Sequence, residues 1–82
     1  MDLSFNELRS FLEITPAGSI SQAAKALGIT QPTLSWTLRR LEERFDTQLF
    51  IRTKQGVTLT RSGEVLETRS RKLLRQWEEI QQ

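Results

Sequence analysis

The chain has 82 residues, enough for one small domain, and its formal net charge of +2 is modest. Cysteine and histidine are absent, which excludes disulfides, thiolate metal sites and the commonest catalytic bases and nucleophiles. We therefore expect no enzyme, metal or cofactor. No apolar run approaches the roughly 20 residues of a membrane span, and the acidic, polar start is no signal peptide, so we expect a cytoplasmic protein without membrane contact.

The first predicted helix begins after Ser4, which forms a capping box with Glu7. Apolar residues recur behind it at helical spacing, namely Phe5, Leu8, Phe11 and Leu12. The sequence TPAGS at 15–19 is expected to end this helix, because proline and glycine so close together do not continue one.

A second, short helix is predicted from a cap at Ser19 or Ser21 to a stop at Gly28. Its alanines, Ala23 and Ala24, allow another helix to approach closely. Ile29 and Thr30 form the following turn, and Thr30 is the expected N-cap of the next helix. A short helix, a tight turn and a second helix match helix-turn-helix architecture.

The third predicted helix begins after the Thr30 cap and accepts Pro32, because a helix's first turn needs no N–H at that position. Its inward stripe is Leu34, Leu38, Leu41 and Phe45. At about 100° per residue, the opposite side carries Pro32, Trp36, Arg39 and Arg40, flanked by Thr33 and Ser35. Trp36 should therefore point away from the core.

This outward face suits the major groove of DNA. Slim polar side chains at the helix start, Gln31, Thr33 and Ser35, can reach base edges, and Arg39 and Arg40 can reach phosphates. Residues 31–61 carry a net charge of +3, as expected for a surface that meets phosphate. An ordinary amphipathic helix with solvated charges, and with its tryptophan packed on a neighbouring chain, stays open as an alternative.

Residues 48–60 are predicted to form a two-stranded hairpin. Leu49 and Ile51 alternate with polar neighbours, KQG supplies a turn, and Val57 and Leu59 resume the alternation. Arg52 and Lys54 lie near its tip, where a wing could contact phosphates or a minor groove. A small hairpin that only covers the core is the alternative.

The last predicted helix begins at the Thr60 cap and continues to Ile80, a length of about 30 Å. Leu66, Ser70, Leu73, Trp77 and Ile80 form a heptad-like series. A domain this small cannot cover the whole helix, so the series predicts a homodimer interface. We expect packing against the chain's own domain only at Val65 and Leu66.

Together these segments resemble the N-terminal winged helix-turn-helix domain of LysR-type transcriptional regulators. The resemblance runs from about Leu3 to Leu66 and is carried by the paired alanines, TQPTLS, RRLEE, LFIR and GVTLTRSG. It implies base readout by Gln31, Pro32 and Ser35, with phosphate contacts from Arg52 and the start of the second helix. Trp36 departs from the polar or basic residue that is common there in the family, and TRSG departs from the usual T-x-A-G.

We thus expect a mainly α fold, with a winged helix-turn-helix DNA-binding domain at 1–60 and a linker and dimerisation helix at 61–82. The expected function is sequence-specific binding of double-stranded operator DNA by a homodimer. The predicted DNA-binding residues are Ser19, Ser21, Thr30, Gln31, Pro32, Thr33, Ser35, Trp36, Arg39, Arg40, Arg52 and Lys54. Family members continue into an effector-binding domain, so a small-molecule effector is expected only through a domain absent from this chain. The alternative is a winged-helix module for protein interaction or dimerisation.

Overall fold

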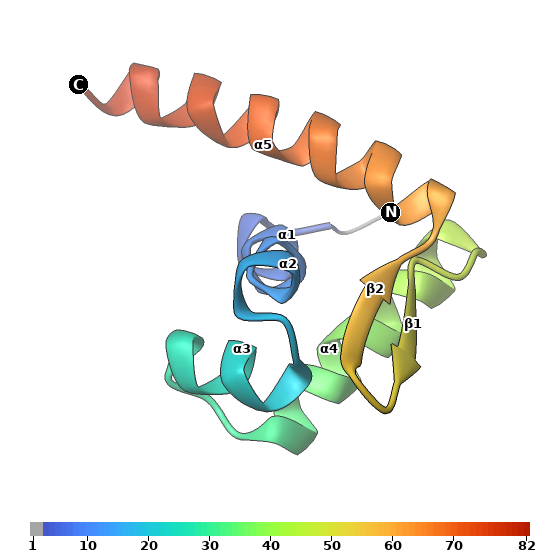
Figure 1. Ribbon diagram of the computed structural model, residues 1–82. Helices are drawn as coiled ribbons and strands as arrows, with labels where there is room; N and C mark the ends of the chain where they lie inside the picture. Colours follow the sequence, from blue (N-terminus) through green and yellow to red (C-terminus); the bar gives the residue numbers. More distant parts are fainter. Residues whose placement is uncertain (1–2) are drawn as a thin grey trace.

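A computed structural model describes residues 3–82; the first two residues of the predicted DNA-binding domain lie outside the described part. The fold is a winged helix-turn-helix followed by a long C-terminal helix, as the sequence predicts (Figure 1). In chain order the elements are α1 Phe5–Leu12, α2 Ile14–Ala17, α3 Ile20–Leu27, α4 Gln31–Phe45, β1 Phe50–Thr53, β2 Gly56–Leu59 and α5 Arg61–Gln81.

The core lies where the helices α1 to α4 meet, and it includes Leu49 and Phe50 at the base of the hairpin. The inward stripe of α4 is confirmed, because Leu34, Leu38 and Leu41 have no exposed surface and Phe45 is partly buried against the same cluster. Ala23 of α3 is also completely buried. Its small side chain lets α3 pack closely on α4, which fixes the helix-turn-helix pair as one rigid unit.

The predicted helix boundaries in this pair are confirmed. Gly28 ends α3 in the left-handed conformation, with φ +71°, and Thr30 caps α4 by accepting a hydrogen bond from the Thr33 backbone N–H. Of the two possible caps for α3, the structure selects Ser19, whose hydroxyl accepts from the Gln22 N–H. Ser21 is instead an exposed residue inside the helix.

The expected end of the first helix at 15–19 is wrong in detail. The helix is interrupted earlier, at Glu13, and Thr15 and Pro16 belong to a further short helix, α2, that ends at Gly18 with φ +83°. Pro16 is tolerated because it lies in the first turn of α2, where a backbone N–H would have no helical partner. The glycine, not the proline, is the residue that ends the helix.

The buried positions on the first strand of the hairpin differ from the prediction, because Phe50 is buried in place of Ile51. Leu49 and Phe50 are both buried, whereas Ile51 is 45% exposed. The reason is that Leu49 precedes β1 in irregular chain, so that the alternation begins at Phe50 and turns Phe50 and Arg52 to the same side. In the observed register Arg52 pairs with Val57, which packs on the core.

The hairpin is fixed to the helical body near its turn. The backbone N–H of Val57 donates to the carbonyl of Gly18, and a side chain at Gly56, where φ is +136°, would collide with that carbonyl. At the base of the hairpin, the N–H of Thr60 donates to the carbonyl of Leu49 and joins the two ends of the hairpin. The bond to Gly18 therefore fixes the wing relative to the end of α2.

The long helix α5 contacts its own domain further along its length than predicted. Ser70 is 3% exposed, Leu66 and Leu74 pack on the core, and the Trp77 ring lies 5.0 Å from the ring of Phe5. Val65, expected to pack inward, is 42% exposed. Because α1 packs against α5, the side of α5 that faces the domain carries Ser70 and Trp77, and Val65 lies outside it.

None of the helices in residues 3–82 has the length and apolar character needed to cross a membrane.

Candidate nucleic-acid interface

The start of α4 lies on the side of the molecule away from α5 (Figure 1). Its first residues are polar and exposed. Gln31, Pro32 and Thr33 are all exposed in its first turn. The hydroxyl of Thr30 donates to the Thr33 hydroxyl over 2.8 Å, so these two side chains support one another at the helix start. The structure thus places the predicted readout residues together and leaves Gln31 accessible.

Ser35, one turn further along, is linked to the wing. The Nη2 atom of Arg52 donates a hydrogen bond to the Ser35 Oγ over 2.7 Å. Sequence patterns predict separate contacts for these residues and do not indicate that they pair. Their contact follows from the corrected strand alternation, because Arg52 is on the side of β1 that faces α4.

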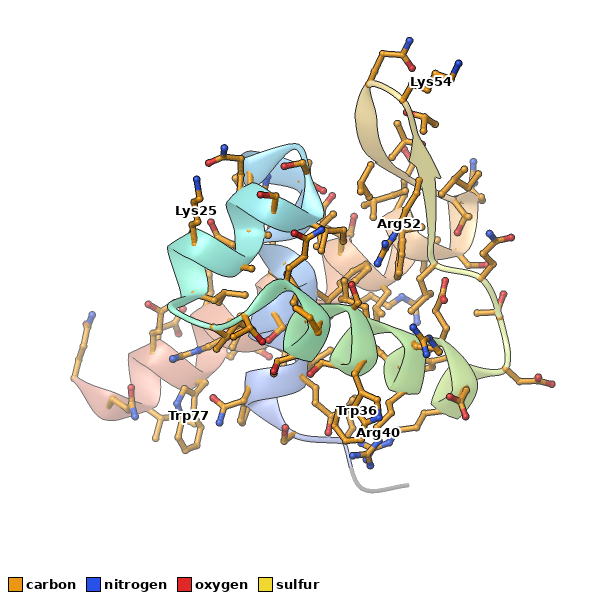
Figure 2. All side chains as sticks on the ribbon, turned by 90° about the horizontal axis from the view of Figure 1, so that it is seen from below. Lys25, Trp36, Arg40, Arg52, Lys54 and Trp77 are labelled. Carbon is orange, nitrogen blue, oxygen red and sulfur yellow. The ribbon has the colours of Figure 1, made fainter. Side chains whose placement is uncertain are left out.

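The positive charges of this region lie on two sides of α4. In Figure 2, Arg52 approaches α4 from the wing, while Trp36 and Arg40 lie on the other side of the helix. Lys54 occupies the turn between the strands and is exposed at the tip of the wing. A phosphate backbone on either side of the helix would meet a guanidinium or ammonium group.

Trp36 is 55% exposed, which confirms that it is no core residue. Its indole ring is covered by the guanidinium of Arg40, whose Cζ lies 4.7 Å from the ring centroid. Arg39 is also exposed on this part of the helix. The predicted outward face therefore exists, with one of its arginines stacked on its tryptophan.

Glu42 also belongs to this region, although the sequence pattern predicts no role for it there. Its Oε2 accepts hydrogen bonds from the backbone N–H groups of Leu49, at 2.8 Å, and of Phe50, at 3.4 Å. Glu42 thereby fastens the start of the wing to α4. Nothing in the local sequence distinguishes it from Glu43, so its role appears only in three dimensions.

Arg44, also on α4, has a structural role. Its Nη1 lies 2.9 Å from Oε1 of Glu7, and both side chains are only 18% exposed. The pair connects α4 to α1 and so helps to hold α4 on the domain.

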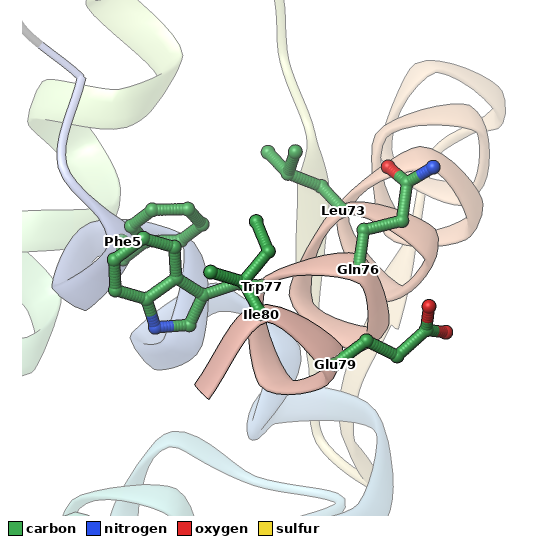
Figure 3. Close-up of a pocket in the computed structure, with 6 residues that line it drawn as sticks. All are labelled: Phe5, Leu73, Gln76, Trp77, Glu79 and Ile80. Atoms are coloured by element: carbon green, nitrogen blue, oxygen red, sulfur yellow. The ribbon is translucent and has the colours of Figure 1, made fainter. Parts of the chain in front are cut away.

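A second exposed feature lies at the far end of α5. Phe5, Leu73, Gln76, Trp77, Glu79 and Ile80 line an open depression of about 520 Å³ (Figure 3). Three apolar members of the predicted dimer series border it, and their exposed fractions are 44% for Leu73, 37% for Trp77 and 75% for Ile80. Leu66 and Ser70, the other two members, are instead covered by the chain's own domain.

In the described range 3–82, no group of three or more acidic, histidine or cysteine side chains is placed to hold a metal ion. The exposed polar side chains of α4 and the cations beside them are suited to binding a polyanion.

Comparisons with known proteins agree with this geometry. Residues 5–64 match the family model described as "Bacterial regulatory helix-turn-helix protein, lysR family". The nitrogen assimilation regulatory proteins nac of Klebsiella aerogenes and of Escherichia coli (strain K12) are each 46% identical over 79 residues, which are 96% of this chain and 26% of theirs. The chain thus spans about a quarter of the length of these curated relatives.

Solved structures of proteins bound to DNA are also similar to this chain, over nearly its whole length. The BenM DBD in complex with benA site 1 DNA is similar with a TM-score of 0.90 and 31% identity, over 95% of this chain and 91% of that one. Vibrio fischeri DarR in complex with DNA is similar with a TM-score of 0.89 and 32% identity, over 96% of this chain and 27% of that one.

Proposed function

Because the chain belongs to the LysR family of bacterial regulatory helix-turn-helix proteins and is a DNA-binding domain of that type, we propose that it binds a specific operator sequence in double-stranded DNA. In this proposal α4 enters the major groove, and the β1–β2 wing contacts the backbone or the adjacent minor groove. The observation that carries it is the exposed first turn of α4, which the buried leucines of the same helix hold outward.

The proposed contacts divide into two groups. Gln31, Pro32, Thr33, Ser35 and Trp36 are placed to meet base edges, because they occupy the first two turns of α4. The proposed phosphate contacts come from the starts of α3 and α4 and from the cations, namely Ser19, Ser21, Thr30, Arg39, Arg40, Arg52 and Lys54. Exposed N–H groups at helix starts favour such anions.

We further propose that two copies bind together as a homodimer through α5. Leu73, Trp77 and Ile80 leave apolar surface exposed beside Phe5, and a second copy would cover it. Two copies would place two α4 helices on successive half-sites of a palindromic operator. A full-length regulator would bind its small-molecule effector through a domain outside residues 1–82, and would act in the cytoplasm, where the bacterial chromosome lies.

The experiment that tests DNA binding is a titration of the chain with duplex DNA at several salt concentrations. Each phosphate that a cation contacts releases counterions, so affinity should fall steeply, with a slope of about −0.9 per contacted phosphate. A module built for protein interaction would bind the duplex weakly or with little dependence on salt. That result would favour the alternative function.

A further inference from the structure

Trp36 and Arg40 form a stacked pair on the exposed side of α4. They are four residues apart and therefore lie on one face of the helix. The Arg40 Cζ is 4.7 Å from the centroid of the indole ring, although the tryptophan is 55% exposed. Figure 2 shows the two side chains next to each other, on the side of α4 away from Arg52.

The group beside the Arg40 guanidinium differs from the groups beside two other arginines. Arg44 and Arg71 each face a carboxylate, at 2.9 Å and 3.3 Å, which neutralises their charge. Within residues 3–82, Arg40 forms no ion pair. Its neighbour is an aromatic ring, which attracts the guanidinium but leaves its charge in place. The N–H groups at the guanidinium edge therefore stay available to an anion.

Stacking on the indole ring also reduces the side-chain freedom that Arg40 loses when it binds an anion. An unrestrained arginine must lose rotamer freedom when it contacts a phosphate, whereas a stacked arginine has lost part of that freedom already. The indole ring itself carries no charge. Its contribution to phosphate binding would thus act entirely through Arg40.

We propose that Trp36 is a positioning residue that holds Arg40 ready to bind a phosphate of the DNA backbone. The inference rests on the proposed DNA binding by α4. Arg40 lies nine residues beyond Gln31, or about 14 Å along the helix axis. It is therefore placed towards the edge of the groove that the first turn enters. Arg52 lies on the other side of α4 (Figure 2). With α4 in the major groove, the two guanidinium groups would face opposite walls of that groove.

The test is the salt dependence of binding to a duplex of random sequence, because phosphate contacts do not depend on sequence. Arg40→Ala should reduce the slope of log affinity against log salt concentration by about one unit. Trp36→Ala should reduce it by the same amount, although it removes no charge. The double variant Trp36→Ala/Arg40→Ala should reduce it no further. Between about 50 and 200 mM salt, one unit corresponds to a roughly three- to fourfold difference in affinity loss.

Two further variants make the result specific. Trp36→Phe keeps an aromatic ring under the guanidinium and should keep the wild-type slope. Arg39→Ala removes an exposed cation next to the pair, and its effect on the slope should add to that of Trp36→Ala. Melting temperatures of all variants should stay near that of the wild type, since both side chains of the pair are exposed.

The outcomes separate this inference from the proposed function. A Trp36→Ala variant with an unchanged slope, beside an Arg40→Ala variant with a reduced one, would overturn the positioning role and leave DNA binding intact. An Arg40→Ala variant with an unchanged slope would also overturn it, because Arg40 would then contact no phosphate. A wild-type chain that binds duplex DNA without salt dependence would instead contradict the proposed function itself.

Discussion

Arg52 of the wing and Ser35 of α4 are joined by a hydrogen bond of 2.7 Å, in which the guanidinium Nη2 donates to the serine Oγ. A serine hydroxyl has one proton and two lone pairs. Because Arg52 occupies one lone pair, the hydroxyl proton stays available to an acceptor on a base edge. The wing thus helps to orient a side chain on α4 that faces the DNA in our proposal.

Arg52→Ala should weaken binding to every duplex and reduce the salt slope by about one unit, since it removes a proposed phosphate contact. Arg52→Lys is the informative partner variant, because it keeps the charge but loses the planar guanidinium that bonds Ser35. The lysine variant should retain the slope and lose discrimination between base pairs at the Ser35 position. Titrations on operator and random duplexes measure both quantities. A lysine variant that discriminates as well as the wild type would show that the bond to Ser35 has no part in readout.

Gln31→Ala should lower affinity for the operator by about 1–3 kcal/mol, because it deletes a side chain able to form two hydrogen bonds with a base. Affinity for random duplex should hardly change. The exposed position of Gln31 means that the variant should fold normally. Equal losses on operator and random DNA would remove Gln31 from the proposed base contacts.

Ile80→Glu and Leu73→Glu should each convert the proposed dimer to a folded monomer, because an unpaired charge would be buried in the interface. Both side chains are exposed in the single chain, at 75% and 44%, so the domain itself should tolerate the change. Sedimentation velocity measures the oligomeric state. Gln81→Glu adds the same charge outside the lining of the depression and should leave the dimer intact. Dimers in all three variants would place the interface elsewhere.

Glu42→Ala should destabilise the domain by about 1–3 kcal/mol, because the backbone N–H of the buried Leu49 loses its charged acceptor. Glu43→Ala is the matched control, since the Glu43 side chain is exposed and its carboxylate takes part in no hydrogen bond or ion pair among residues 3–82. Chemical denaturation measures both free energies of unfolding. If the two variants were equally stable, Glu42 would not be what fastens the wing to α4.

The local features of the fold could be predicted because they depend on a few neighbouring residues. The caps at Ser4, Thr30 and Thr60 and the helix stop at Gly28 follow from side chains within one helical turn. Helical periodicity likewise assigned Leu34 to the core and Trp36 to the surface.

The side-chain contacts that could not be predicted from the sequence connect residues far apart in the chain. Ser35 and Arg52 are 17 residues apart, and Trp77 meets Phe5 across almost the whole sequence. The hairpin alternation failed for a related reason. Backbone bonds from Leu49 and Phe50 to Glu42 hold irregular chain ahead of the strand, and periodicity alone does not detect such bonds.

The central claim, specific operator binding by paired α4 helices, is tested most directly by selecting tight-binding duplexes from a random pool. We expect the selected sequences to share two inverted half-sites whose centres are about 10 base pairs, or a multiple of that, apart. The enriched duplexes should bind at least about 10³-fold more tightly than random DNA at the same salt concentration. A pool that shows no enriched sequence, from a chain that is folded and dimeric, would contradict the account.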